Sequence, residues 1–168
     1  MQKLVAIVLV TGLAAGCATT SSMSTKNNVS VAKMNLNSVS VNLKQKYDNP
    51  VFYSQADIEQ YLNKCLITEL SKKGKYQANS SANLNVNVDY KRVYSGEAFG
   101  MKSSVGSPQL NYNYQVTDNN TILQQNSEND LIVNSGLIGN FNYTGNTEKK
   151  DENGYIDALC RHIAKKVY

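Results

Sequence analysis

The sequence predicts an α+β fold, a two-layer sandwich in which two helices cover one face of an antiparallel-rich sheet, with the element order β-α-β-β-β-α. Two observations support this prediction. Several segments alternate apolar and polar residues with a period of two, which is typical of strands that have one covered and one wet face. Two other segments place apolar residues three and four positions apart, which is typical of helices with one buried face.

The first strand region covers residues 29–43. Apolar residues alternate there, but the phase changes after Val31 and changes back before Val39. Such phase changes indicate either two short strands or one strand that carries a bulge.

The first helix follows a turn at Asn49-Pro50. Ser54 is a suitable N-cap, and Asp57 stands three residues later in place of the usual Glu of a capping box. Gly74 follows two lysines and predicts the end of the helix. Apolar residues recur at helical spacing: Ile58, Tyr61, Leu62, Cys65, Leu66 and Leu70.

The clearest strand is predicted over Leu84–Tyr94, where one face carries Leu, Val and Tyr and the other carries mainly Asn. The same alternation returns from Leu110 to Val116. Asp118-Asn119-Asn120 then predicts a tight turn, and a returning strand over 121–125 continues toward Val133.

The last predicted element is a helix from about Tyr155, with Lys165-Lys166 in its final turn. Its apolar face contains Ile156, Leu159, Cys160, Ile163, Ala164 and Val167.

Residues 1–16 have the features of a signal peptide: a positive charge at Lys3, an apolar stretch over 4–13 that is too short to span a bilayer, and small residues before Cys17. Together with Cys17 they resemble the signal peptide and lipobox of bacterial lipoproteins. The resemblance implies cleavage before Cys17 and lipidation of its thiol. An ordinary secretory signal with a chance cysteine is the alternative.

The domain organisation follows from this leader: a signal peptide over 1–16, lipidated Cys17 with a flexible tether over 17–28, and one periplasm-facing domain over 29–168. The eleven residues 18–28 are mostly polar, and as a flexible chain they place the domain roughly 17–20 Å from its anchor. By the sorting rule of Gram-negative lipoproteins, Ala18 implies the outer membrane. In a Gram-positive cell the same chain would stay on the outer face of the plasma membrane.

Charge disfavours a nucleic-acid partner. Cleavage removes Lys3 and no acidic residue, so the net charge becomes 16 − 13 = +3. The basic residues are dispersed in short groups, such as Lys91-Arg92, which are typical of solvated element ends and not of a basic binding face.

The sequence offers few residues arranged as catalytic or metal-binding groups are, so we expect no enzyme, no cofactor and no metal site. His162 is the only histidine, and the last helix places it on or near the surface. The acidic pairs Glu128 with Asp130 and Asp151 with Glu152 lie in polar stretches, which are typical of solvated loops.

Two Gly-rich loops, Ser95–Ser107 and Asn134–Asn146, contain large apolar residues, among them Phe99, Met101, Ile138 and Phe141. Such residues can form a contact surface for a protein or a lipid. Alternatively, they fold back over the sheet as a small second core.

Cys65 and Cys160 are the two cysteines left after lipidation, and each lies on the apolar face of its predicted helix. If both helices cover one sheet face, a disulfide can join them, in a compartment where disulfides persist. The alternative is two unpaired cysteines that act as small buried apolar residues.

The lipobox, the first helix ending in LSKKGKY, the strand ANLNVNVDYKRVYSG, the hairpin and the last helix together resemble small outer-membrane lipoproteins of the YajG-like and ABC-transporter auxiliary types. The resemblance concerns the architecture and carries over no functional motif. Our first hypothesis is a non-enzymatic, periplasm-facing lipoprotein that binds another envelope protein as an accessory subunit of a transport or secretion assembly. A binder of a small apolar ligand or lipid and an inhibitor of a foreign hydrolase remain as alternatives.

Overall fold

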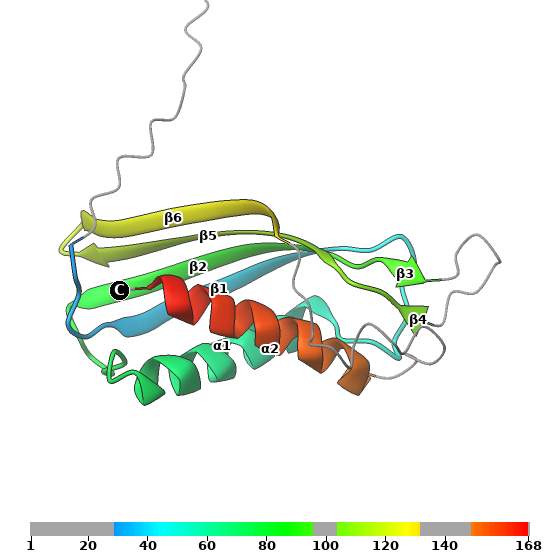
Figure 1. The fold of residues 1–168 in the computed structure, drawn as a ribbon, viewed down its shortest axis with the longest axis horizontal. Helices are drawn as coiled ribbons and strands as arrows, with labels where there is room; N and C mark the ends of the chain where they lie inside the picture. Colours follow the sequence, from blue (N-terminus) through cyan, green and yellow to red (C-terminus); the bar gives the residue numbers. More distant parts are fainter. Residues whose placement is uncertain (1–28, 96–103, 132–148, 168) are drawn as a thin grey trace, which may run out of the picture.

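The computed structural model describes residues 29–95, 104–131 and 149–167. In chain order they form β1 (Asn35–Lys44), α1 (Gln55–Lys72), β2 (Ala82–Lys91), β3 (Tyr94–Ser95), β4 (Ser104–Val105), β5 (Gln109–Asp118), β6 (Thr121–Leu131) and α2 (Lys149–Lys166). The predicted α+β class is confirmed, because both helices lie on one face of a four-stranded sheet (Figure 1). A separate two-stranded hairpin, β3–β4, extends at one end.

The sheet has the strand order β1-β2-β5-β6 and is mixed. β1 and β2 are parallel, and α1 connects them, since parallel neighbours need a crossover connection. The β2–β5 and β5–β6 pairs are antiparallel. The register shifts between Leu36 and Ser38, so this part of the chain forms one strand with a bulge.

The turn between β5 and β6 has the conformation that its residues predict. Asn119 and Asn120 have φ values of 46° and 66°, and Asp118 pairs with Thr121. Two consecutive residues with positive φ are characteristic of a type I′ turn, whose twist matches that of the flanking strands. Asn tolerates this conformation better than most residues.

Both ends of α1 are capped by local interactions. Ser54 and Asp57 form a reciprocal capping box at the N-terminus. At the C-terminus Gly74 has a φ of 67°, and the Lys75 N–H donates to the Leu70 carbonyl at 2.8 Å. With the Gly74 N–H donating to the Ser71 carbonyl at 2.9 Å, this is a Schellman motif.

The main core lies between the sheet and the helices. The apolar inward side chains of β2 and β5 alternate with exposed or half-buried polar ones and are all buried, as their periodicity predicts. They contact the apolar faces of α1 and α2. The most deeply buried members include Leu84, Val86, Tyr90, Leu110, Tyr112, Ile58, Leu62, Leu66, Ile156, Leu159 and Ile163.

Two predicted boundaries are wrong. α2 begins at Lys149, six residues before Tyr155, because polar residues of its first turns have tertiary partners that the apolar pattern does not reveal. The strand predicted to reach Tyr94 ends at Lys91. Tyr94 belongs to β3 and packs in a second, smaller cluster with Phe52 and Val105.

The molecule has two distinct ends along its long axis (Figure 1). Val29, the first described residue, lies near the start of β6, where the Gln124 side chain donates to its carbonyl at 2.9 Å. The opposite end consists of residues 45–54, the β3–β4 hairpin and the first turns of α2, and we call it the distal end. Among the described residues, no helix has the length and apolarity needed to cross a membrane.

Candidate functional site at the distal end

A buried ion pair between Arg92 and Glu152 organises the distal end. Their side chains are each 1% exposed. Arg92 donates from Nε to Glu152 Oε1 at 2.8 Å and from Nη2 to Oε2 at 2.9 Å, a bidentate arrangement. The prediction that both residues are solvated is therefore wrong, since Arg92 continues the inward phase of β2 and Glu152 lies within α2.

The remaining hydrogen-bonding capacity of the pair is also used. Glu152 accepts from the Tyr90 hydroxyl at 3.2 Å and from the Tyr53 N–H at 3.1 Å. Arg92 donates to the Tyr53 carbonyl at 2.6 Å and to the Gln45 side chain, and its guanidinium lies 5.5 Å from the centre of the Phe52 ring. This satisfied network offsets the cost of removing two charges from water.

Arg92 and Tyr90 both keep their protons at neutral pH. Burial alone would lower the pKa of Arg92, but the hydrogen bond and charge of Glu152 raise it above its ordinary value. Burial, together with the Glu152 carboxylate, raises the pKa of Tyr90 well above its ordinary value. Tyr90 therefore stays a neutral hydrogen-bond donor at neutral pH.

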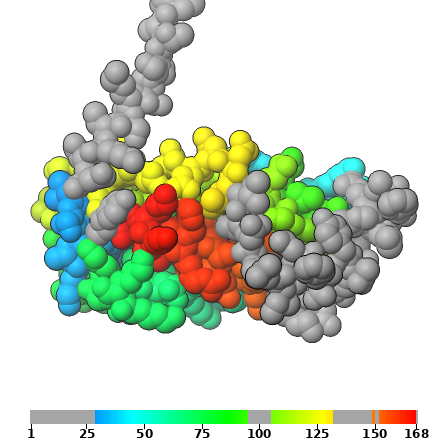
Figure 2. Space-filling view, viewed as in Figure 1, coloured from blue at the N-terminus to red at the C-terminus, as the bar shows by residue number. Residues whose placement is uncertain are grey.

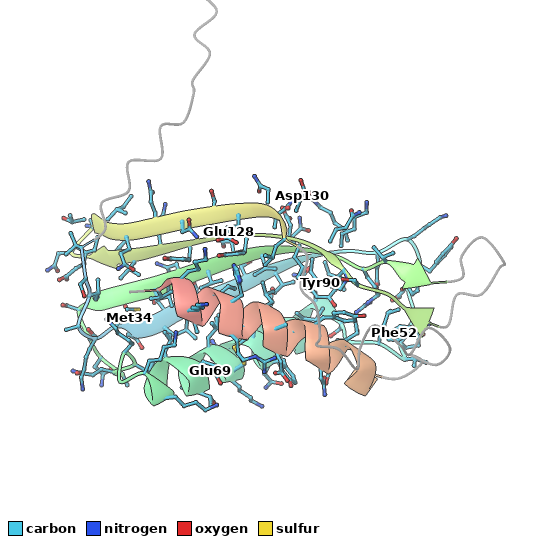
Figure 3. The ribbon with its side chains drawn as sticks, viewed as in Figure 1. Met34, Phe52, Glu69, Tyr90, Glu128 and Asp130 are labelled. Atoms are coloured by element: carbon cyan, nitrogen blue, oxygen red, sulfur yellow. A yellow bond between two sulfur atoms is a disulfide. The ribbon has the colours of Figure 1, made fainter. Side chains whose placement is uncertain are left out.

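The ion pair lies at the base of both Gly-rich segments. Arg92 precedes β3 by two residues, and β3 leads into 96–103. Glu152 is in the first turn of α2, directly after 132–148. Figure 3 shows Tyr90 and Phe52 at this end and Met34 at the other. One interaction thus joins the chain just before the first segment to the chain just after the second.

A small aromatic cluster supports the β3–β4 hairpin. Phe52, Tyr94 and Val105 are buried, and Tyr47 packs against them. The Tyr94 hydroxyl donates to the Tyr47 carbonyl at 2.9 Å, and the ring centres of these two residues are 5.7 Å apart. Val105, near the end of the first predicted loop, therefore belongs to a second core.

The residues named as the contact surface, Phe99, Met101, Ile138 and Phe141, lie outside the described residues, as does Cys17. Their roles stay predictions.

A shallow groove crosses the distal end between residues 43–57 and the start of α2. Lys149 forms an ion pair with Asp57 at 3.3 Å, and its ammonium lies 5.5 Å from the centre of the Tyr53 ring. Hydrogen bonds from the Ser54 backbone and side chain, followed by Lys149, lower the pKa of Asp57. Val51, at this end, is a large apolar residue that is 48% exposed.

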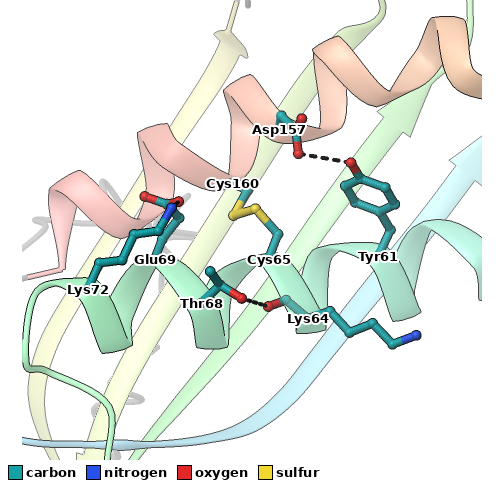
Figure 4. Close-up of a disulfide and its surroundings, with 8 residues drawn as sticks. All are labelled: Tyr61, Lys64, Cys65, Thr68, Glu69, Lys72, Asp157 and Cys160. Carbon is teal, nitrogen blue, oxygen red and sulfur yellow. Dashed lines mark hydrogen bonds and ion pairs between the residues drawn. A yellow bond between two sulfur atoms is a disulfide. The ribbon is translucent and has the colours of Figure 1, made fainter.

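Cys65 and Cys160 are joined as a disulfide between α1 and α2, with their Cα atoms 6.2 Å apart (Figure 4). This separation is within the range that a disulfide requires. Beside it, the Tyr61 hydroxyl on α1 donates to Asp157 Oδ1 on α2 at 3.0 Å. The space-filling view shows the two helices, green and red to orange, against each other (Figure 2).

His162 lies on α2 and is half-buried, and its Nε2 is 2.7 Å from Glu128 Oε2 on β6. Lys166 approaches the other oxygen of Glu128 at 2.9 Å. Burial acts to raise the pKa of Glu128, but Lys166 and His162 outweigh it and lower the pKa to about 2. The prediction that Glu128 lies in a solvated loop is wrong, since it joins the β6 edge to α2.

No three His, Cys, Asp or Glu side chains among the described ranges are grouped so that they could hold a metal ion. The Arg92–Glu152 network and the Glu128–His162–Lys166 cluster consist of ion pairs and the hydrogen-bond donors that support them. Both clusters are therefore suited to fastening elements together.

Comparisons with known proteins give no family: no family model and no curated protein sequence matches this chain. Among solved structures, it is similar to a minor lipoprotein from Acinetobacter baumannii, with 16% identity and a TM-score of 0.38 over 83% of this chain and 92% of that one. It is also similar to a dodecameric PelC variant from Paraburkholderia phytofirmans, with 11% identity and a TM-score of 0.33 over 79% and 91%. Neither similarity is close enough to assign a function.

Proposed function

We propose that this chain is a lipid-anchored, non-enzymatic envelope lipoprotein that binds another envelope protein through its distal end. In this proposal Cys17 carries the lipid, the domain faces the periplasm from the outer membrane, and the chain is an accessory subunit of a transport or secretion assembly, as in the YajG-like and transporter-auxiliary lipoproteins that it resembles.

The observation that carries the proposal is the position of the Arg92–Glu152 pair. A buried ion pair contributes little net stability compared with apolar residues of the same volume, and its best-attested use is to fix geometry. Here it joins the chain just before the segment that contains Phe99 to the chain just after the segment that contains Phe141. A precise base under two apolar segments is what a preorganised protein-binding surface requires.

The direction of the molecule also supports the proposal. Val29, which follows the tether, lies at the end opposite to the distal end. A domain anchored through residues 17–28 would then direct its distal end away from its attachment point, toward a partner in the periplasm.

The experiment is site-specific photo-cross-linking in intact cells. A photoreactive amino acid replaces Val51 at the distal end or, as the matched control, Ile122 near the β5–β6 turn, which is 41% exposed. We expect a discrete protein adduct from position 51 and none from position 122. Equal adducts from both positions, or an adduct from position 122 alone, would contradict the proposal.

The role of the apolar segments is tested in the same cells with Phe99→Asp and Phe141→Asp. Each substitution is expected to abolish the adduct at position 51 and to leave the Tm of the purified protein nearly unchanged, because a contact residue is exposed in the free protein. A large fall in Tm would instead place these side chains in a second core. Co-purified lipid that is lost in the same variants would favour the apolar-ligand alternative.

A further inference from the structure

The sheet face opposite the helices carries a hollow that crosses all four strands. Its lining contains five side-chain amides, one carboxylate and serine hydroxyls from β1 and β6. The amides and the carboxylate are Asn42, Asn87, Asn111, Asn113, Asn129 and Asp89. Val88 and Tyr112 contribute only to its floor, because their side chains are buried in the core on the other side.

The choice of Asn at these positions is unusual. Asn is depleted in strands, whereas Thr and other β-branched residues suit the wet face of a sheet. Yet Asn occupies three consecutive outward positions of β2, and the residues opposite them on β5 are polar too. The cross-strand pairs are Asn83 with Thr117, Asn85 with Gln115 and Asn87 with Asn113. Repeated residues that oppose the local structural preference are expected where a function requires them.

Cross-strand hydrogen bonds hold these amides in place. Asn87 Nδ2 donates to Asn113 Oδ1 at 3.0 Å, and Asn42 Nδ2 donates to Asp89 Oδ1 at 2.7 Å. The Asp130 N–H donates to Asn111 Oδ1 at 2.8 Å. Each amide group has two donor hydrogens and an oxygen with two lone pairs, so one such bond leaves further capacity facing outward.

The hollow has little net electrostatic attraction for ions. Among the described residues that line it, Asp89 alone carries a charge, and it is already paired with Lys44 at 3.5 Å and bonded by Asn42. No apolar side chain is available there to form the core that a protein interface needs. The lining therefore offers many fixed, neutral donors and acceptors across a broad surface.

We propose that this face binds an uncharged polysaccharide chain. Sugar hydroxyls donate and accept hydrogen bonds in the same way as side-chain amides do, and a hollow that crosses four strands can contact several sugar units. The lining of this hollow shares no residue with that of the groove at the distal end, so the two sites can be tested separately.

The test uses the full lipidated chain, purified in a zwitterionic detergent so that no sugar headgroup competes. Hexamers of cellulose, amylose and chitin serve as three uncharged probes, and binding is measured by isothermal titration calorimetry. The variant is Asn87→Thr with Asn113→Thr, and the matched control is Asn63→Gln on α1.

We expect saturable binding of at least one hexamer, at least a tenfold weaker Kd in the double variant, and an unchanged Kd in the control. Because Thr favours strands, the double variant should keep or raise its Tm. A weaker Kd with an unchanged Tm would then report the loss of sugar contacts and not the loss of the folded state. Absence of heat with all three hexamers, or equal binding by the double variant, would overturn the proposal. The adduct at position 51 should be unaffected in every case.

Discussion

Arg92 is the residue whose position explains most about the distal end. It stands two residues after Tyr90, in the inward phase of β2, so its guanidinium enters the protein interior instead of the solvent. A charge there is tolerated because Glu152 lies opposite it and the other donors of Arg92 reach Tyr53 and Gln45. The network thereby joins three segments that are distant in sequence.

Breaking this pair from one side should be costly. Arg92→Met or Glu152→Gln is expected to lower the free energy of unfolding by about 3–5 kcal/mol, because each leaves a buried polar partner without its counterion. The double variant Arg92→Met with Glu152→Leu should recover only part of that loss, because it removes both buried charges but leaves the Tyr53 and Tyr90 groups without their hydrogen-bond partners. Urea denaturation of the purified proteins measures both effects.

The matched control is Lys44→Met, which removes an exposed ion pair with Asp89 and should cost less than about 1 kcal/mol. Single variants of the buried pair that cost no more than this control would show that Arg92 and Glu152 are solvated in solution.

The sequence contains part of this information. The period of two places residue 92 inward, but a charged pair at the end of a strand is more commonly solvated, and only the position of Glu152 in the fold reverses that expectation. Glu152 itself was not predictable, because the polar run before Tyr155 has no apolar periodicity. Its helical conformation depends on long-range contacts with Tyr53 and Arg92.

At the scale of elements, the sequence predicted both ends of α1 and the β5–β6 turn, because each is determined by residues that are neighbours in the chain. The capping box at Ser54, the Gly74 cap and the type I′ turn at Asn119-Asn120 all depend on residues adjacent in the chain. The parallel pairing of β1 with β2 and the strand order depend on contacts between distant segments, so periodicity could not specify them. The short β3–β4 hairpin has too few residues to show a period.

The disulfide should act mainly on the unfolded chain. The loop between Cys65 and Cys160 spans 95 residues, and closing a loop of about that length is worth about 4–5 kcal/mol in the entropy model, with measured effects more often about 2–4 kcal/mol. Cys65→Ala with Cys160→Ala should therefore lower the free energy of unfolding by about 2–4 kcal/mol and retain the far-UV circular dichroism of the folded state.

The pairing itself is checked by mass spectrometry of the unreduced protein after denaturation in an alkylating agent. Neither Cys65 nor Cys160 should be modified. Alkylation of both thiols without reductant would eliminate the bridge and restore the interpretation of two buried free cysteines.

For the molecule as a whole, our proposal assigns attachment to the end near Val29 and partner binding to the distal end. The carbonyls at the end of α2 are held by the Lys73 ammonium, which contacts Ala164 O at 2.6 Å, and by the Tyr114 hydroxyl, which donates to Lys166 O at 2.7 Å. Near Val29, these backbone carbonyls are therefore bonded within the domain. At the distal end, the chain continues from β3 into one Gly-rich segment and enters α2 from the other. The sequence predicted those segments, but only the fold shows that Arg92, which precedes the first, and Glu152, which follows the second, form an ion pair.

Attachment at Cys17 is the prediction on which the orientation of the whole molecule depends. An anchor with two or three acyl chains is effectively permanent, whereas a single chain binds marginally. Cys17→Ser removes the acceptor thiol, so the protein should leave the membrane fraction or persist as an uncleaved precursor of higher mass. Cys65→Ser with Cys160→Ser is the matched control and should stay with the membranes. Fractionation and intact mass measure both, and a Cys17→Ser protein that is cleaved before residue 17 and still sediments with membranes would refute the anchor.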